Sequence, residues 1–258
     1  MTRRRRKSGG EFFREGFMSG DGESLWAGLV VIGDEVLSGR TQDVHVSWFA
    51  RHLGERGIRL GEVRVIRDDP GEIGAAVEAL RFRYAYVFTT GGIGPTHDDR
   101  TIDAIGAALG VAVVEDELIL SAFRERFGEL TAERRRMSRI LEGGRSVPCS
   151  LATAPAICWG NIYILAGFPR VAREQLRAVL PELRRGAVVL SESRSLMLGE
   201  SRIAGPLSEL SGRHPGVEIG SYPMEPEAGV YETVVVFRSV SEDLLRAAVG
   251  EFDGLQLG

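Results

Sequence analysis

The sequence has few of the residues that build metal centres and disulfide frameworks. It contains two cysteines and four histidines in 258 residues, and none of them shows the spacing of a zinc site. No apolar stretch approaches the roughly 20 residues that a transmembrane helix needs. The basic run near the N-terminus is not followed by an apolar segment, as it would be in a signal peptide. We therefore expect a cytoplasmic protein with no membrane partner.

The overall charge does not indicate a protein dedicated to nucleic acid. The net charge is -4, and the hydrophobic and charged contents of 43% and 26% are those of an ordinary globular protein. Positive charge is concentrated only in residues 3–7, Arg-Arg-Arg-Arg-Lys, which precede an irregular glycine-containing stretch. We predict that residues 1–24 are a disordered basic leader and that the protein has no specific nucleic-acid partner.

Short apolar runs alternate with segments of helical spacing along the first half of the chain. The predicted strands are residues 29–32, 62–66 and 84–88, with helices between them. Asp43 precedes the first helix as a predicted N-cap. This order is typical of a parallel sheet with helices on both faces. We therefore predict an α/β fold, with three layers (α/β/α) around a mostly parallel sheet, over residues 25–186.

The next segment contains a stretch rich in arginine. Residues 111–114 are predicted as a strand, and residues 116–127 and 131–141 as helices. The second helix carries Arg134, Arg135, Arg136 and Arg139, which we interpret as a solvated face. Apolar runs on either side of Gly160-Asn161 then predict a β-hairpin, followed by a helix over about residues 170–180.

The pattern changes near residue 186. Strand-like runs and helical spacings after this point describe a β-α-β-β-α unit, with Ser241 placed to cap the last helix. We predict a separate small α+β domain over residues 187–258. It shows no constellation of catalytic residues, and we expect it to serve packing, oligomer contact or narrowing of the cleft.

Residues 89–99, Thr-Thr-Gly-Gly-Ile-Gly-Pro-Thr-His-Asp-Asp, are the most informative stretch. They follow a predicted buried strand and precede a segment of helical spacing. Glycines there allow positive φ and let a ligand approach backbone N–H groups, while the helix N-terminus favours an anion. The spacing matches neither a dinucleotide fingerprint nor a Walker A loop. We predict that a phosphate group binds at Gly91, Gly92, Gly94, Pro95 and Thr96.

Several carboxylates are predicted to converge on the same site. Ligands of parallel sheets bind outside the carboxyl ends of the strands, where residues 33–35, residues 67–69 and the glycine-rich loop should meet. Carboxylate oxygens are preferred ligands of hard divalent cations. We therefore predict a divalent metal site formed by Asp34, Asp98 and Asp99.

Two runs of residues resemble a known family. They are residues 32–43, Ile-Gly-Asp-Glu-Val-Leu-Ser-Gly-Arg-Thr-Gln-Asp, and residues 89–101, which end in Arg-Thr. Both resemble the MoaB/Mog molybdopterin-binding family, and most of all the N-terminal parts of competence/damage-inducible protein A and of animal FAD synthases. The likeness covers about residues 29–180. The C-terminal unit resembles the KH-like domain of competence/damage-inducible protein A.

The resemblance implies a site for a phosphorylated pterin, such as molybdopterin, or for a nucleotide. Two aspartates central to the pterin adenylyltransferases match Asp43 and Asp99, which are therefore the expected catalytic residues. The first run would add binding residues, namely Gly33, Asp34, Glu35, Ser38 and Thr41. The family also implies a homo-oligomer, either a dimer or a trimer.

Other positions depart from the family pattern, so three functions stay open. His45 stands where asparagine is usual, the loop at residues 149–156 lacks an asparagine and two glycines, and residues 166–172 lack the usual acidic residue. Our first hypothesis is a metal-dependent nucleotide pyrophosphatase that uses magnesium or cobalt and acts on substrates such as ADP-ribose or FAD. The alternatives are a molybdopterin adenylyltransferase in molybdenum cofactor biosynthesis and a non-catalytic pterin- or nucleotide-binding protein.

Overall fold

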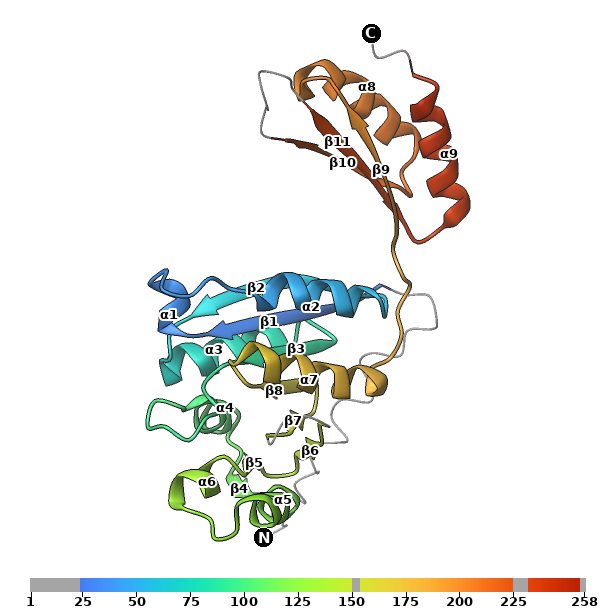
Figure 1. The fold of residues 1–258 in the computed structure, drawn as a ribbon. Helices are drawn as coiled ribbons and strands as arrows, with labels where there is room; N and C mark the ends of the chain where they lie inside the picture. Colours follow the sequence, from blue (N-terminus) through green and yellow to red (C-terminus); the bar gives the residue numbers. More distant parts are fainter. Residues whose placement is uncertain (1–23, 150–153, 225–231, 256–258) are drawn as a thin grey trace, which may run out of the picture. The chain divides into compact units, whose positions relative to one another are not determined.

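A computed structural model describes residues 24–149, 154–224 and 232–255 (Figure 1). The chain separates into two compact units, Met1–Gly186 and Ala187–Gly258. Each unit has buried hydrophobic clusters of its own. The first 23 residues of the predicted leader and residues 150–153 of the altered loop lie outside the described residues.

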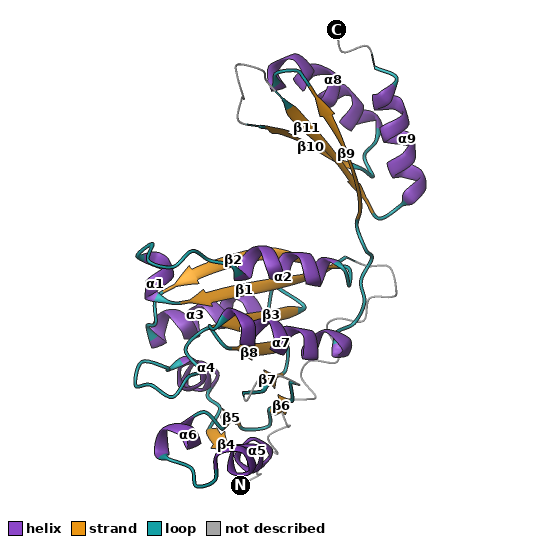
Figure 2. Cartoon of the chain, in the orientation of Figure 1, coloured by secondary structure: helices purple, strands orange, loops and turns teal. Residues whose placement is uncertain are grey.

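A six-stranded sheet forms the centre of the first unit, in the order β2-β1-β3-β8-β7-β6 (Figure 2). Its strands are β1 (Leu25–Ile32), β2 (Ile58–Ile66), β3 (Tyr86–Thr90), β6 (Arg145–Val147), β7 (Ala156–Trp159) and β8 (Ile162–Leu165). The four strands β2, β1, β3 and β8 run parallel, whereas β7 pairs antiparallel with both β8 and β6. The predicted mostly parallel sheet is therefore confirmed.

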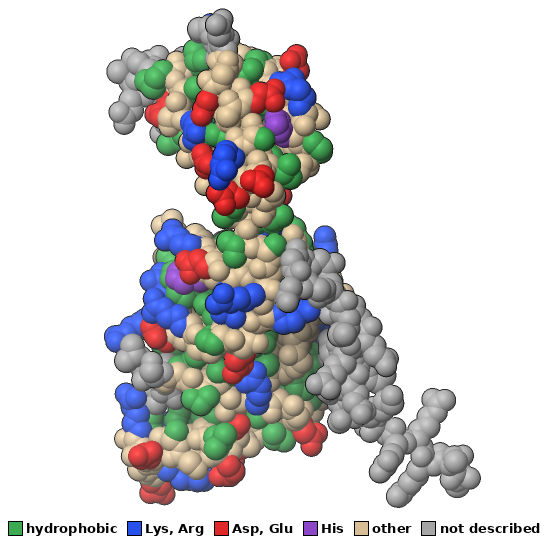
Figure 3. All heavy atoms as spheres, turned by 90° about the vertical axis from the view of Figure 1, so that its right-hand side faces the viewer, with side chains coloured by type: hydrophobic (Ala, Val, Ile, Leu, Met, Phe, Trp, Pro, Cys, Tyr) green, Lys and Arg blue, Asp and Glu red, His purple; other side chains and the backbone are tan. Residues whose placement is uncertain are grey.

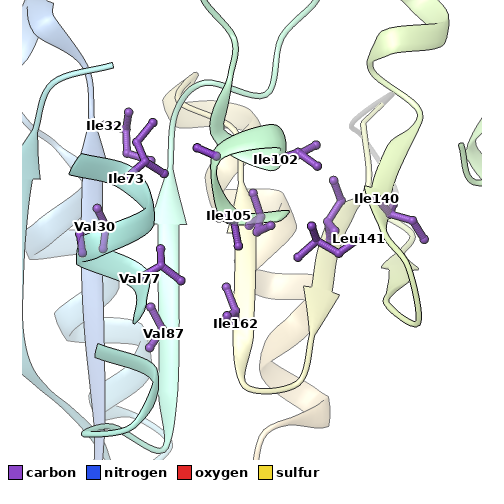
Figure 4. Packing of buried hydrophobic residues seen from close by; sticks show 14 of the residues in the cluster. Val30, Ile32, Ile73, Val77, Val87, Ile102, Ile105, Ile140, Leu141 and Ile162 are labelled. Carbon is purple, nitrogen blue, oxygen red and sulfur yellow. The ribbon is translucent and has the colours of Figure 1, made fainter. Parts of the chain in front are cut away.

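Helices cover both faces of this sheet. One face packs on α2 (His45–Gly54) and α7 (Pro169–Val179), and the other packs on α3 (Pro70–Arg81), α4 (Thr101–Leu109) and α5 (Glu117–Phe127). Alternate residues of β1 serve the two cores, since Val30 faces one cluster and Val31 the other. Figure 4 shows Val30 in the first of these clusters, beside residues of α3 and α4. This arrangement is the predicted three-layer α/β/α fold.

Local sequence signals explain where several helices begin. α3 starts at Pro70, and the side chain of Asp69 accepts a hydrogen bond from the N–H of Glu72 at 3.0 Å. α5 starts after Asp116, whose Oδ1 accepts from the N–H groups of Leu118 and Ile119. These are the polar caps that leave a helix N-terminus with fewer unpaired donors.

The predicted helix over residues 131–141 is wrong in its second half. α6 covers only Ala132–Arg136, and the chain then forms β5 (Arg139–Leu141), which pairs antiparallel with β4 (Val113–Glu115). Ile140 and Leu141 are buried beside α4 (Figure 4), so tertiary packing outweighs the helical propensity of the arginine-rich stretch. The short strand β6 and the helical turn α1 (Asp34–Leu37) were not predicted either.

The second unit contains three antiparallel strands and two helices. The strand order is β10-β11-β9, with α8 and α9 contributing to its core. The bounds are β9 (Leu190–Leu196), α8 (Glu200–Arg213), β10 (Glu218–Pro223), β11 (Thr233–Ser239) and α9 (Glu242–Asp253), and the short 3-10 helix η1 (Leu180–Glu182) precedes this unit. Ser241 caps α9 as predicted, because its hydroxyl accepts from the N–H of Leu244. The predicted β-α-β-β-α order is confirmed.

In the described ranges, no helix combines the length and apolar character needed to cross a membrane. On the face seen in Figure 3, basic and acidic side chains are interspersed with apolar ones over both units.

Phe237 provides a test of the core of the second unit. Its side chain is fully buried and its ring lies 5.1 Å from that of Phe252. We expect Phe237→Ala to lower the stability of this unit by about 3–5 kcal/mol, as large-to-small core substitutions do. Native-state hydrogen exchange should show this loss in the amides of β11. Equal loss of protection in β1 would contradict the assignment of separate cores.

Candidate functional site

The glycine-rich loop leaves the end of β3 in a conformation that requires glycine at two positions. Gly91 and Gly92 have φ values of 107° and 67°. A Cβ atom on Gly91 would lie 2.2 Å from the carbonyl oxygen of Ile32, and one on Gly92 would lie 2.2 Å from Oγ1 of Thr101. Both positions therefore exclude any side chain, for conformational and for steric reasons.

Hydrogen bonds anchor the loop to its neighbours. The N–H of Gly91 donates to the carbonyl oxygen of Leu165 at 3.1 Å, and the buried Thr101 donates from Oγ1 to the carbonyl oxygen of Gly91 at 2.9 Å. The expectation that the Gly91 N–H binds phosphate is therefore wrong, because this N–H already has a partner. In the described part of the chain, the N–H groups of Gly92 and Gly94 have no such partner.

Asp99 closes the loop onto itself. Its Oδ2 accepts hydrogen bonds from the N–H of Thr96, at 2.8 Å, and from the hydroxyl of the same residue. A Cβ atom on Gly94 would lie 2.6 Å from this oxygen, so the third glycine makes room for the carboxylate. Pro95 is exposed at the tip of the loop. Asp99 thus shapes the loop, and its predicted catalytic role stays a prediction.

The first loop of the site begins at the end of β1. The N–H of Gly33 donates to the carbonyl oxygen of Ile66, and α1 follows with Asp34 and Glu35 exposed in its first turn. The hydroxyl of Ser38 donates to the carbonyl oxygen of Glu35, and the N–H of Thr41 donates to the same oxygen at 3.0 Å. Ser38 and Thr41 therefore form the turn after α1.

Asp68, at the end of β2, joins the acidic side of the site. Its Oδ2 accepts from the N–H of Asp34 at 3.0 Å. Burial raises the pKa of Asp68 above its ordinary value, and the negative charges of Asp34, Glu35 and Asp98 raise it further against the effect of that hydrogen bond. The three predicted segments thus meet at one edge of the sheet. Asp68 was not among the predicted site residues, although its segment was.

The predicted metal ligands are not gathered into a complete coordination sphere. Over the described residues, no three His, Cys, Asp or Glu side chains lie close enough to hold a metal ion together. Mg²⁺ usually takes only one or two protein carboxylates and fills its remaining positions with phosphate and water oxygens. A partial set of carboxylates beside the glycine-rich loop fits such an ion. The assignment of Asp34, Asp98 and Asp99 as ligands stays a prediction.

The carboxylate of Asp43 caps the first turn of α2, but from one residue before the predicted position, because Val44 is the N-cap residue. Its Oδ1 accepts from the N–H of His45 at 3.1 Å, and its Oδ2 accepts from the N–H of Val46 at 3.0 Å. His45 is buried, and its Nε2 lies 3.0 Å from the carbonyl oxygen of Gly167. Burial lowers the pKa of His45, against the hydrogen bond to Gly167 and the charge of Asp43, which both raise it. Nε2 carries a proton in this arrangement, because the carbonyl oxygen that it faces can only accept.

The loop between β8 and α7 approaches the glycine-rich loop closely. A Cβ atom on Gly167 would lie 3.1 Å from Cα of Gly91. α7 then begins at Pro169 with no acidic residue in its first turn, and Phe168 before it is exposed. This loop, which departs from the family pattern, is therefore part of the same site.

The arginine-rich stretch braces the exit of the glycine-rich loop. Arg136 donates to the carbonyl oxygen of Asp99 at 2.8 Å, and Arg139 forms two hydrogen bonds with Asp103 at 2.8 and 3.0 Å. Arg135 forms an ion pair with Glu115. The interpretation as a solvated face is therefore wrong for Arg136 and Arg139, whereas Arg135 is exposed as expected. Their contacts span more than 30 residues of sequence for Arg136 and Arg139, and no local pattern marks them.

Comparison with known families agrees with this geometry. A family model described as "Probable molybdopterin binding domain" matches residues 28–185, and one described as "FAD synthase, middle domain" matches residues 189–255. The first match covers more than half of the chain. The chain therefore belongs to the molybdopterin-binding domain family, of the kind found in CinA-like proteins.

Relatives carry both parts of the chain. A "Probable FAD synthase" of Caenorhabditis elegans is 27% identical over 90% of this chain and 50% of its own length. A "CinA-like protein" of Syntrophus aciditrophicus is 31% identical over 80% of this chain and 53% of its own length. The chain thus spans about half the length of these relatives. The crystal structure of CinA from Thermoplasma acidophilum, whose function is described as unknown, matches with a TM-score of 0.58 and 28% identity, over 62% of this chain and 98% of that one.

Gly91→Ala should disrupt phosphate binding through its clash with Ile32. Gly110 provides the matched control, since its φ of 65° is also positive but no atom lies within 4 Å of its Cβ position. Both variants should lose about 1 kcal/mol from the strained backbone. Only Gly91→Ala should also weaken the binding of pyrophosphate, by about tenfold or more, in calorimetric titrations. Equal affinities for the two variants would contradict the site.

Asp68→Asn should stabilise the fold at neutral pH in the absence of metal. A carboxyl whose pKa is raised by folding destabilises the native state above that pKa, and this cost disappears as the pH falls and the group becomes protonated. We expect the melting temperature to rise by about 1–2 °C at pH 7 and not at pH 3. Mg²⁺ should stabilise the wild type more than the variant. Equal stabilisation by Mg²⁺ would argue against a cation at this edge.

Proposed function

We propose that the chain is a metal-dependent nucleotide pyrophosphatase of the molybdopterin-binding domain family. The observation that carries this proposal is that groups attracting an anion and groups attracting a cation lie at the same edge of the sheet. The loop at Gly92 and Gly94 offers N–H groups that have no partner among the described residues, and such groups attract an anion. Asp34, Asp68 and Asp98 beside it attract a cation. A pyrophosphate bound together with a divalent cation satisfies both.

The reaction would be an in-line displacement at one phosphorus of the pyrophosphate. The oxygen of a water molecule forms a bond to this phosphorus while the bond to the bridging oxygen breaks, and the bridging oxygen leaves on the second phosphate. A divalent ion supplies charge neutralisation at the phosphate oxygens. The loop N–H groups hold the phosphate, and the carboxylates of Asp34 and Asp98 would hold the ion. Asp99 would orient the water or accept its proton.

The names of the relatives support a nucleotide ligand. One relative is described as a probable FAD synthase, and the second unit matches the middle domain of FAD synthase. FAD contains a pyrophosphate between its two nucleoside parts, which is the group that the proposed reaction cleaves. We therefore propose FAD, ADP-ribose or a similar dinucleotide as the substrate.

A non-catalytic nucleotide- or pterin-binding function is the second candidate. Both expected catalytic aspartates also have a structural role, since Asp43 caps the first turn of α2 and Asp99 closes the glycine-rich loop. Such roles would preserve the aspartates even without turnover. Adenylyl transfer to molybdopterin is a third outcome of the same experiment.

Asp99→Asn separates loop closure from catalysis. The amide oxygen can accept both hydrogen bonds from Thr96, whereas the amide nitrogen replaces the carboxylate oxygen that would face metal or water. We expect the variant to bind nucleotide but to release AMP from ADP-ribose or FAD at least about 100-fold more slowly than wild type, with Mg²⁺ or Co²⁺ present.

Asp116→Asn is the control, because the carboxylate of Asp116 also accepts local hydrogen bonds but lies at the start of α5, outside the site. It should hydrolyse these substrates as wild type does. Turnover by Asp99→Asn at the wild-type rate would overturn the catalytic assignment. Saturable binding without turnover in the wild type itself would favour the second candidate, and transfer of AMP from ATP to molybdopterin would favour the third.

We also propose a KH-like assignment for the second unit, a cytoplasmic location and a dimeric or trimeric state. The antiparallel sheet and two helices of the second unit are compatible with the first of these. The family resemblance supports the oligomeric state, and the basic run without a following apolar segment supports the location.

A further inference from the structure

We propose that His45 is a positioning residue that joins the turn carrying Asp43 to the glycine-rich loop, through the backbone of Gly167. Where turnover is measured, this inference rests on the proposed function. Its structural part can be measured without any substrate.

The first link connects Asp43 with His45. The two carboxylate oxygens of Asp43 accept from the N–H groups of His45 and Val46. Because both oxygens are engaged, the carboxylate and the first turn of α2 are fixed relative to each other. Asp43 therefore fixes the backbone of His45, and with it the position from which the imidazole extends.

The second link connects the imidazole with the β8–α7 loop. Nε2 of His45 lies 3.0 Å from the carbonyl oxygen of Gly167, which can only accept a hydrogen bond. The ring also packs edge-on against Phe49, and Phe49 packs in the same way against Phe88 of β3. With only 8% of its surface exposed, His45 has little freedom to move away from Gly167.

The third link connects the β8–α7 loop with the glycine-rich loop. Gly167 approaches Gly91 so closely that a Cβ atom on it would lie 3.1 Å from the Cα of Gly91. Two residues earlier, the carbonyl oxygen of Leu165 accepts from the N–H of Gly91. The segment from Leu165 to Gly167 is therefore held by His45 on one side and supports Gly91 on the other.

These links form a continuous path from one expected catalytic aspartate to the loop that carries the other. A displacement of the imidazole would move the carbonyl group of Gly167 and release the backbone that supports Gly91. The positions of Asp43 and Asp99 would then vary independently. Catalysis would suffer more than binding, because reacting groups must be placed more accurately than a bound phosphate.

Variants of His45 separate this role from simple filling of the core. In His45→Gln the amide nitrogen takes the place of Nε2 and can still donate to Gly167, whereas His45→Leu fills the space without a donor. His45→Asn is a polar variant that is too short to reach. The control is His52→Leu, because His52 lies on the same helix but stacks on Trp48, and its Nδ1 contacts the carbonyl oxygen of Trp48 and not that of Gly167.

Two measurements are needed on the full-length protein. Hydrogen exchange by mass spectrometry should show faster exchange at residues 89–99 and 165–168 in His45→Leu and His45→Asn, and not in His45→Gln or His52→Leu. Turnover of ADP-ribose with Mg²⁺ should show kcat lowered by about 10- to 100-fold in the same two variants, with KM changed by less than about threefold. If His45→Leu does not fold, His45→Asn carries the same expectation.

Unchanged exchange in His45→Leu and His45→Asn would overturn the proposal. It would also fall if His45→Gln behaved like His45→Leu, since the hydrogen bond would then not be what matters. If the wild type hydrolyses no nucleotide, the proposed function fails, and the exchange measurement still decides the role of His45.

Discussion

The close approach of Gly91 to the carbonyl oxygen of Ile32 is the constraint on which the site depends. β3 lies between β1 and β8, so its last residues are confined on both sides by backbone. On one side the carbonyl group of Ile32 leaves no room for a Cβ atom, and on the other the carbonyl group of Leu165 accepts the N–H of Gly91. Only glycine can therefore occupy position 91, where the chain leaves the sheet. The path of the whole loop up to Thr101 follows from that exit.

Basic and acidic side chains lie in different places around this loop. Arg136 and Arg139 are committed to α4 and the loop exit through the carbonyl group of Asp99 and the carboxylate of Asp103. Among the described residues, the carboxylates of Asp34 and Asp68 form no ion pair with an arginine, although the charge of Arg67 acts on Asp34. A phosphate alone would be repelled by these carboxylates, and a cation alone would gain nothing from the loop N–H groups. The site is therefore suited to a charged pair.

Sequence patterns were sufficient where the physical cause was local. The alternation of apolar runs predicted the parallel sheet, and the strand–glycine–helix order predicted where the loop leaves it. The failures arose from long-range packing. Arg136 and Arg139 contact Asp99 and Asp103 across more than 30 residues. Likewise, the contact between His45 and Gly167 spans 122 residues, and only the folded sheet brings them together.

The hydrogen bonds of the two expected catalytic aspartates distinguish their roles. Asp43 uses one oxygen for the N–H of His45 and the other for that of Val46, so its carboxylate faces α2. Asp99 receives both of its hydrogen bonds on Oδ2, and no partner of Oδ1 is found among the described residues. A metal ion or a water molecule can therefore bind Asp99 without opening the loop. At Asp43 it would have to share oxygens that already hold the helix. We therefore propose that Asp99 contacts the ligand directly, while Asp43 maintains the geometry in which that contact is made.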